Sequence, residues 1–395
     1  MLRESPFHSR TSAICESWEW RGWAGYLAAS SYQLIGSMEY YAIRHSAGLL
    51  DITPLYKYEI KGKDSLALLS RVVTRDARKL VPGQIYYTPW CDDRGDVVDD
   101  GTLWNFGGGV YRLTAAEPNL RWLEDNSTQL DVSIRDVSQE VAALALQGPT
   151  SRAILMEAAD GAVEKLKYFR FVETKFDGIP VQISRTGYTG DLGYELWTEW
   201  DRAEKLWDAL MEHGRAHDIV PAGMAALDVA RIEAGLILAE VDFMPSRHAI
   251  IESQRYTPWE LGLDWAVAVE KGPFVGRAAL VDQMRRGVPR RTVGISVDWP
   301  SVVRLYTEHD LPPESPQTPT REKIPIYSGP RQIGYATSTT WSPTLKEYIG
   351  LATVPAAYSA LGSVVDFEVT VEGERKTAPA TVVARPFYDP PQKKS

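Results

Sequence analysis

Helix-like and strand-like hydrophobic patterns follow one another irregularly along this chain, and this irregularity is the feature that most limits its fold. A doubly wound parallel sheet requires strands and helices in regular succession. Here residues 56–60 predict a strand that ends at Gly62, and residues 65–73 predict a short helix. Residues 97–113 predict a hairpin that turns at the three glycines 107–109. We therefore expect an α+β protein, and its 395 residues are too many for one hydrophobic core.

The pattern changes near residue 287. Before that point the sequence predicts helices over residues 40–49, from Asp201 onward, and over residues 224–234. Apolar residues at helical spacing predict the buried face of the third helix, namely Ala225, Val229, Ile232 and Leu236. On the same helix, Asp228 and Arg231 are spaced to form an ion pair. Later, strand-like alternation and a proline-rich loop predict a β-rich domain. We place the boundary so that residues 1–286 and 287–395 form separate units.

Composition excludes several classes of protein. The formal net charge is −9, and no run of lysine or arginine is long enough for a nucleic-acid track. No stretch of about 18 apolar residues is present that would cross a membrane. Residues 1–10 are too charged for a signal peptide, and Cys15 and Cys91 cannot form a disulfide framework. We expect a reduced, cytoplasmic protein without nucleic-acid or membrane partners.

Common motifs for phosphate, dinucleotide, hydrolase and zinc sites are also missing from the sequence. The six histidines are scattered. His213 and His217 lie one helical turn apart, but that helix end is predicted to be solvated. We therefore expect no metal site.

Several separated segments, in the same order, resemble those of aminomethyltransferases, the T proteins of the glycine cleavage system, and of their folate-dependent demethylase relatives. The segments are RHSAGLLDIT at residues 44–53, GDVVDD at 95–100, LQGP at 146–149, TGYTGDLGYE at 186–195, RIEAG at 231–235, FVGRAAL at 274–280 and TWSPTL at 340–345. The resemblance implies a three-lobed fold, in which two intertwined α+β lobes bind tetrahydrofolate and a β-rich domain follows. It also implies an enzyme that transfers a one-carbon unit.

The resemblance places the pterin ring of tetrahydrofolate beside Glu195. The pterin has a guanidine-like edge of parallel N–H donors, and a carboxylate accepts two parallel hydrogen bonds from such an edge. Tyr188, in the same glycine-rich turn, would flank or stack on the ring. Tyr87 matches a family tyrosine near the folate. Without the resemblance, Glu195 would be an ordinary strand residue and Tyr87 a core aromatic.

The same resemblance assigns catalysis to Asp99. N5 of tetrahydrofolate must lose or share a proton as it attacks the one-carbon unit, and a nearby carboxylate accepts that proton or stabilises the developing positive charge. Asp99 and Asp100 are neighbours on a predicted strand, so their side chains point to opposite faces and only one can enter the pocket. The resemblance favours Asp99, although Asp-Asp-Gly alone would signal only a turn.

Departures from the T-protein pattern lie on what the resemblance makes the donor side of the site. Leu227 stands where T proteins have a functional arginine, and an aliphatic side chain cannot replace a planar cation. Ala116 stands where they have an asparagine. The stretch 243–260 is longer than in T proteins and carries His248 and Tyr256, two candidate proton donors for a leaving group.

These departures predict that the donor of the methyl or methylene group is a small methylated molecule. The 19 tyrosines and 13 tryptophans favour an aromatic donor, such as an O-methyl or methylenedioxy compound, over a sulfonium or an N-methyl amine. Two alternatives stay open. One is a glycine-cleavage aminomethyltransferase that takes its donor from a lipoyl carrier protein. The other is a folate-binding accessory protein without transferase activity, which would not need a carboxylate at N5.

Overall fold

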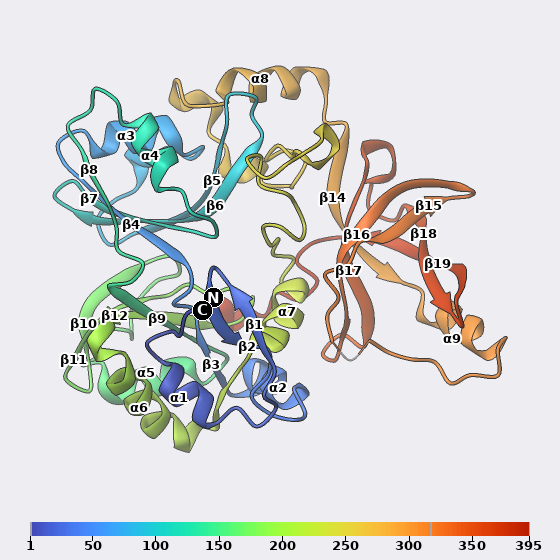
Figure 1. Ribbon diagram of the computed structural model, residues 1–395, viewed down its shortest axis with the longest axis horizontal. Helices are drawn as coiled ribbons and strands as arrows, with labels where there is room; N and C mark the ends of the chain where they lie inside the picture. Colours follow the sequence, from blue (N-terminus) through green and yellow to red (C-terminus); the bar gives the residue numbers. More distant parts are fainter. Residues whose placement is uncertain (1, 317, 395) are drawn as a thin grey trace.

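The computed structural model describes residues 2–316 and 318–394, which form three lobes (Figure 1). Two lobes are each built on an open β-sheet, and the third is a closed β-barrel. This arrangement confirms the predicted mixed α+β class with a β-rich C-terminal part. No helix within the described residues is both long enough and apolar enough to cross a membrane.

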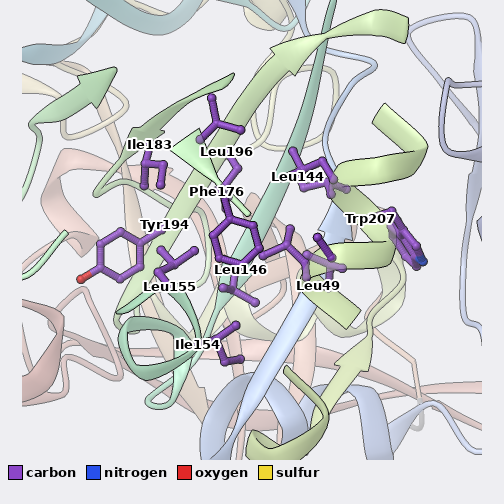
Figure 2. Packing of buried hydrophobic residues seen from close by; sticks show 14 of the residues in the cluster. Leu49, Leu144, Leu146, Ile154, Leu155, Phe176, Ile183, Tyr194, Leu196 and Trp207 are labelled. Atoms are coloured by element: carbon purple, nitrogen blue, oxygen red, sulfur yellow. The ribbon is translucent and has the colours of Figure 1, made fainter. Parts of the chain in front are cut away.

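The first lobe is a six-stranded sheet in the order β10-β11-β12-β9-β3-β13. Its strands are β3 (Ala47–Asp51), β9 (Val141–Gln147), β10 (Phe171–Phe176), β11 (Ile179–Ser184), β12 (Gly193–Glu199) and β13 (Ile219–Pro221). Helices α5 (Ser151–Ala158) and α6 (Ala203–Gly214) cover one face. Figure 2 shows the core between them, where Leu146, Phe176 and Leu196 meet Leu155 and Trp207. Burial of these large side chains stabilises the lobe by roughly 1.5–3 kcal/mol each.

The second lobe is inserted into the first. After β3 the chain leaves the first sheet, builds a complete five-stranded sheet in the order β5-β6-β7-β4-β8, and returns at β9. Its strands are β4 (Tyr56–Lys61), β5 (Ile85–Cys91), β6 (Val97–Gly107), β7 (Val110–Ala115) and β8 (Ser133–Asp136). Helices α3 (Ser65–Val72) and α4 (Leu120–Asn126) pack on its outer face. The insertion explains why the two lobes are intertwined, and it leaves the inner faces of the two sheets directed at each other.

The third lobe is a closed barrel of β14 (Arg290–Val297), β15 (Ile324–Ser328), β16 (Arg331–Ser342), β17 (Glu347–Pro355), β18 (Val364–Val371) and β19 (Glu374–Val383). Helix α9 (Trp299–Thr307) packs against it. Helix α8 (Arg277–Arg286) precedes the barrel and ends at Gly287, whose φ of +89° favours glycine. We propose that the unit boundary lies at this glycine.

The predicted helix over residues 40–49 is wrong in its second half. Helix α2 (Ser37–His45) ends four residues earlier, and residues 47–51 form strand β3 at the centre of the first sheet. Ala47, Leu49 and Leu50 are buried on both faces of that sheet. A short apolar run of this kind fits a buried strand as well as a helix, so the sequence pattern could not distinguish them. The N-terminal helix α1 (His8–Ala13) and the hairpin of β1 (Trp20–Trp23) and β2 (Tyr26–Ala29) complete this side.

Helix α7 (Met224–Glu233) forms as predicted, but its predicted buried face is wrong. Ala225, Val229 and Leu236 are only partly buried, whereas Asp228, Arg231 and Glu233 are buried. The reason is that α7 lies between α2 and barrel strand β16, so both sides of the helix are covered.

The buried charges of α7 connect three of the family-like segments. Glu233 accepts hydrogen bonds from Arg44 Nη2 (2.6 Å), Tyr40 Oη (2.6 Å) and Ser342 Oγ (2.5 Å). Arg231 pairs with Asp228 at 3.4 Å, as its spacing predicts, and more closely with Asp242 at 2.7 Å. Such a buried pair is costly to break from one side, so these residues hold the first lobe and the barrel in one arrangement.

Candidate active site

The inner face of the second sheet contributes Tyr87 and Asp100. In the β5–β6 register Tyr87 lies opposite Thr102, and Asp100 lies opposite Pro89. Residues directly opposite each other in an antiparallel pair share a face, and alternate residues along a strand share it too. Ile85 lies two positions before Tyr87 on β5, and Trp104 lies four positions after Asp100 on β6. Both side chains pack into the apolar cluster between the two lobes. Tyr87 and Asp100 therefore face the other lobe.

The inner face of the first sheet contributes Glu195, and the turn before β12 contributes Tyr188. Glu195 lies two residues before Trp197, which packs into the same inter-lobe cluster, so both side chains leave β12 on the inner side. Tyr188 packs against that cluster, and its hydroxyl donates to the carbonyl of Ile237. The turn needs glycine at 190, where φ is +75° and a Cβ would lie 2.5 Å from that of Ala234.

Glu195 is a partly buried carboxylate without a cationic partner in the described chain. No lysine, arginine or histidine of the described chain lies within ion-pair distance of it. Burial raises the pKa of Glu195 to about 7, against the opposing effect of a hydrogen bond with Thr186. A carboxylate that is partly shielded from solvent and has no cation beside it is suited to a ligand that brings its own N–H donors. The guanidine-like edge of a pterin is such a ligand, so the residues present fit tetrahydrofolate.

Asp99 and Asp100 have different surroundings in the structure, and of the two only Asp100 lies on the inner face of the second sheet. Asp99 lies opposite Trp90, whose ring is in the outer core of the second lobe, and its side chain is fully buried there. Its Oδ2 accepts from the Glu117 amide (2.9 Å) and Asn119 Nδ2 (2.7 Å), and its Oδ1 accepts from the amide of Asp100 (2.8 Å). The two carboxylates thus lie on opposite faces of β6, as strand alternation predicts, and the catalytic role of Asp99 stays a prediction.

The Tyr87 hydroxyl forms a hydrogen bond with Asp100. Burial raises the pKa of Asp100 to about 6, and this hydrogen bond opposes the rise. Burial and the neighbouring Asp100 charge raise the pKa of Asp99 as well. Two neighbouring carboxyls with raised pKa values hold a proton to a higher pH than ordinary aspartates do.

An aromatic residue and a cationic residue that lie beside Tyr87 were not found by sequence reasoning. Trp265 stacks on Tyr87 with ring centroids 5.6 Å apart and an interplanar angle of 27°. Arg75 lies over Tyr86 at 3.8 Å and over Trp265 at 5.7 Å. Trp265 is 62% exposed, and an exposed tryptophan next to a predicted site residue indicates a binding surface. Exposure cannot be predicted from the sequence, so this signal was not available there.

The structure gives the two donor-side candidates different surroundings. His248 is exposed, with Nδ1 3.1 Å from Glu240 Oε1 and Nε2 4.0 Å from Glu117 Oε2. Because the Glu117 amide binds Asp99, His248 lies on the Asp99 side of β6. Tyr256 instead donates its hydroxyl to Thr353 of the barrel (3.3 Å) under the guanidinium of Arg290, which is a structural contact.

Leu227 is buried in the inter-lobe cluster, where its side chain is 7% exposed. The residue after it, Asp228, accepts from Arg321 at 2.6 Å and from Arg21 at 3.4 Å. Arg321 ends the stretch that follows α9, so a long loop from the barrel returns to the helix that carries Leu227. Two arginines from outside α7 thus pair with Asp228, the residue next to Leu227.

Comparison with known proteins gives a consistent result. Residues 9–271 match the GCVT N-terminal domain, and residues 310–389 match the glycine cleavage T-protein C-terminal barrel domain. The chain is 37% identical over 356 residues to aminomethyltransferases of Bacillus cereus and Bacillus anthracis, covering 89% of each protein. It is also similar to the crystal structure of the glycine cleavage system aminomethyltransferase T from Bartonella henselae. That match has 25% identity and a TM-score of 0.83, and it covers 98% of this chain and 99% of the other.

Proposed function

The chain belongs to the glycine-cleavage T-protein family of tetrahydrofolate-dependent transferases, and from this premise we propose that it transfers an aminomethyl-borne one-carbon unit to tetrahydrofolate held between its first two lobes. The observation that carries the proposal is the partly buried carboxylate of Glu195, which has no cationic partner in the described chain and lies on the inner face of one sheet, with Tyr87 and Asp100 on the inner face of the other. Tetrahydrofolate supplies a nucleophilic N5 that accepts the one-carbon unit.

In this proposal Glu195 and Tyr188 bind the pterin, and Asp100 and Tyr87 transfer the proton. Glu195 holds the pterin edge by two charge-assisted hydrogen bonds. Tyr188 is fixed by its bond to Ile237 and forms a wall of the site. Asp100 takes or shares the proton released at N5, because the pKa of Asp100 lies near the working pH. Tyr87 then passes on or restores that proton.

The first prediction concerns binding. Tetrahydrofolate is expected to raise the melting temperature of the purified protein without added metal or nucleotide, because a ligand that binds only the folded state stabilises it by mass action. At a concentration 100 times Kd the gain is about 2.7 kcal/mol, or a few degrees. A thermal shift titration measures it, with Glu195→Ala as the control that should need far more ligand. A flat titration of well-folded protein would contradict folate binding.

The second prediction concerns the donor. With tetrahydrofolate and an aminomethyl-lipoyl carrier protein, the chain is expected to release ammonia, and release should require both partners. The comparisons support this donor better than the small methylated donor that the sequence departures predict. The small donor remains the second candidate because position 227 holds a buried leucine where T proteins have a cation. Absence of ammonia, with folate binding intact, would favour the second candidate, and methylated aromatics, sulfoniums and amines would then be screened.

A further inference from the structure

The inner face of the first sheet carries a large aromatic side chain beside Glu195. Trp197 lies two residues after Glu195 on β12, so both side chains point to the same side of the sheet. Trp197 is 2% exposed and packs into the inter-lobe cluster. Burial raises the pKa of Glu195, and Trp197 is one of the groups that oppose this rise. What holds Trp197 in place therefore bears on Glu195.

Two buried cations of the second lobe lie over the ring of Trp197. Nζ of Lys57, on β4, and Cζ of Arg112, on β7, are each 5.8 Å from the ring centroid. Both distances are within the range in which a cation is attracted to the face of an indole ring. Arg112 also donates to Oε1 of Gln182 (2.7 Å), which lies opposite Trp197 in the pairing of β11 with β12. The two cations thus face the same part of the first sheet from two strands of the second.

Neither Lys57 nor Arg112 has a carboxylate within ion-pair distance in the described part of the chain. Glu59, which lies opposite Arg112 in the second sheet, pairs instead with exposed cations on β4 and β8. Burial lowers the pKa of Lys57 to about 7 and that of Arg112 to about 10, so each charge is costly to keep. The negative face of an aromatic ring offsets part of this cost. Loss of the Trp197 ring would therefore leave both charges less well compensated.

Lys57 also binds both segments that connect the two sheets. Its Nζ donates to the carbonyls of Thr53 and Leu55 (both 2.7 Å), which lie in the segment from β3 to β4. Its backbone amide donates to Oγ of Ser138 (2.9 Å), and its carbonyl accepts from the amide of Val137 (2.8 Å). These two residues lie in the segment from β8 back to β9. The two connections therefore converge on a residue whose ammonium group faces the first sheet.

We propose that Trp197 is a positioning residue for Glu195, and that the two cations over its ring hold it in place. This inference rests on the proposed function, in which Glu195 binds the pterin edge. Glu195 comes from one sheet and Tyr87 and Asp100 from the other, so a folate that contacts all three depends on how the sheets are placed. Displacement of an orienting group by about 1 Å is enough to lower a rate by roughly 100-fold.

The test is a double-mutant cycle on Kd for tetrahydrofolate, measured by titration calorimetry at pH 8, where the Glu195 carboxylate is largely ionised. Trp197→Leu is expected to raise Kd about tenfold and Arg112→Met about fivefold, and the double variant should stay close to tenfold because both changes break one interaction. Trp197→Phe keeps an aromatic face and should remain within about threefold of the wild type. Lys61→Met, an exposed change on β4, is the matched control and should leave Kd unchanged.

Each outcome decides the question. If the losses from Trp197→Leu and Arg112→Met multiply in the double variant, the cations do not hold Trp197, and the proposal is overturned. It is also overturned if Trp197→Leu lowers the melting temperature but leaves Kd per folded molecule unchanged, because Trp197 is then a packing residue only. If Arg112→Met does not fold, the same cycle with Lys57→Met at pH 7 decides between these results. Failure of the wild type to bind tetrahydrofolate would overturn the inference together with the proposed function.

Discussion

Asp100→Asn is expected to lower kcat by about 10²–10⁴-fold, the usual loss when an acid–base group is removed, while tetrahydrofolate still binds. Asparagine keeps the shape of the side chain and a hydrogen bond to Tyr87, but it cannot accept a proton. The measurement is single-turnover transfer to tetrahydrofolate, with Kd determined separately. A loss in kcat without a change in Kd identifies a group that acts in the transition state rather than in binding.

Asp99→Asn is the matched control, since it makes the same substitution one residue away on the other face of β6. All three protein donors that bind Asp99 are N–H groups, and an asparagine amide nitrogen would meet at least one of them as a second donor. We expect a loss of about 1–3 kcal/mol in the free energy of unfolding and little loss of turnover per folded molecule. The reverse pattern, with Asp99→Asn inactive and Asp100→Asn active, would restore the assignment made from the sequence.

The difference between Asp99 and Asp100 shows what sequence could predict of the site. Strand alternation was enough to place the two carboxylates on opposite faces. Choosing between them requires the register of β5 against β6 and the knowledge that Ile85 and Trp104 pack between the lobes. These are contacts between segments far apart in the chain, and no local pattern contains them.

Helix α7 shows the same limit for the fold. The i, i+3 spacing predicted the pair of Asp228 and Arg231. Apolar periodicity assumes that one face of a helix meets water, and this helix is covered on two sides, so its charged residues are buried as well as its apolar ones. The closer partner of Arg231 is Asp242, which lies in the loop after the helix and has no fixed spacing to predict.

Glu195 links folate binding to pH and to stability, and this link gives the second large expected effect. Glu195→Ala should weaken tetrahydrofolate binding by about 2–3 kcal/mol, because a bidentate charged partner is lost. Binding needs the ionised carboxylate. With a pKa of about 7 in the free protein, Kd should stay constant above pH 8 and rise toward tenfold per unit as pH falls below 7.

For stability the sign is opposite to that for binding. The pKa of Glu195 is raised in the folded state above its usual 4.5, so the folded chain holds its proton more tightly than the unfolded chain. The contribution of Glu195 to the free energy of unfolding is therefore fully present below pH 4.5 and is lost as pH rises through 7.

Glu195→Gln should therefore stabilise the ligand-free protein by about 1–3 kcal/mol at pH 8 and have little effect at pH 5. It should also bind folate poorly at both values. Urea unfolding at the two pH values measures this, with the exposed Glu199→Gln on the same strand as control. A Glu195→Gln protein that gained no stability at pH 8 would mean that the carboxylate already has a counter-charge, and then it would not need the pterin edge.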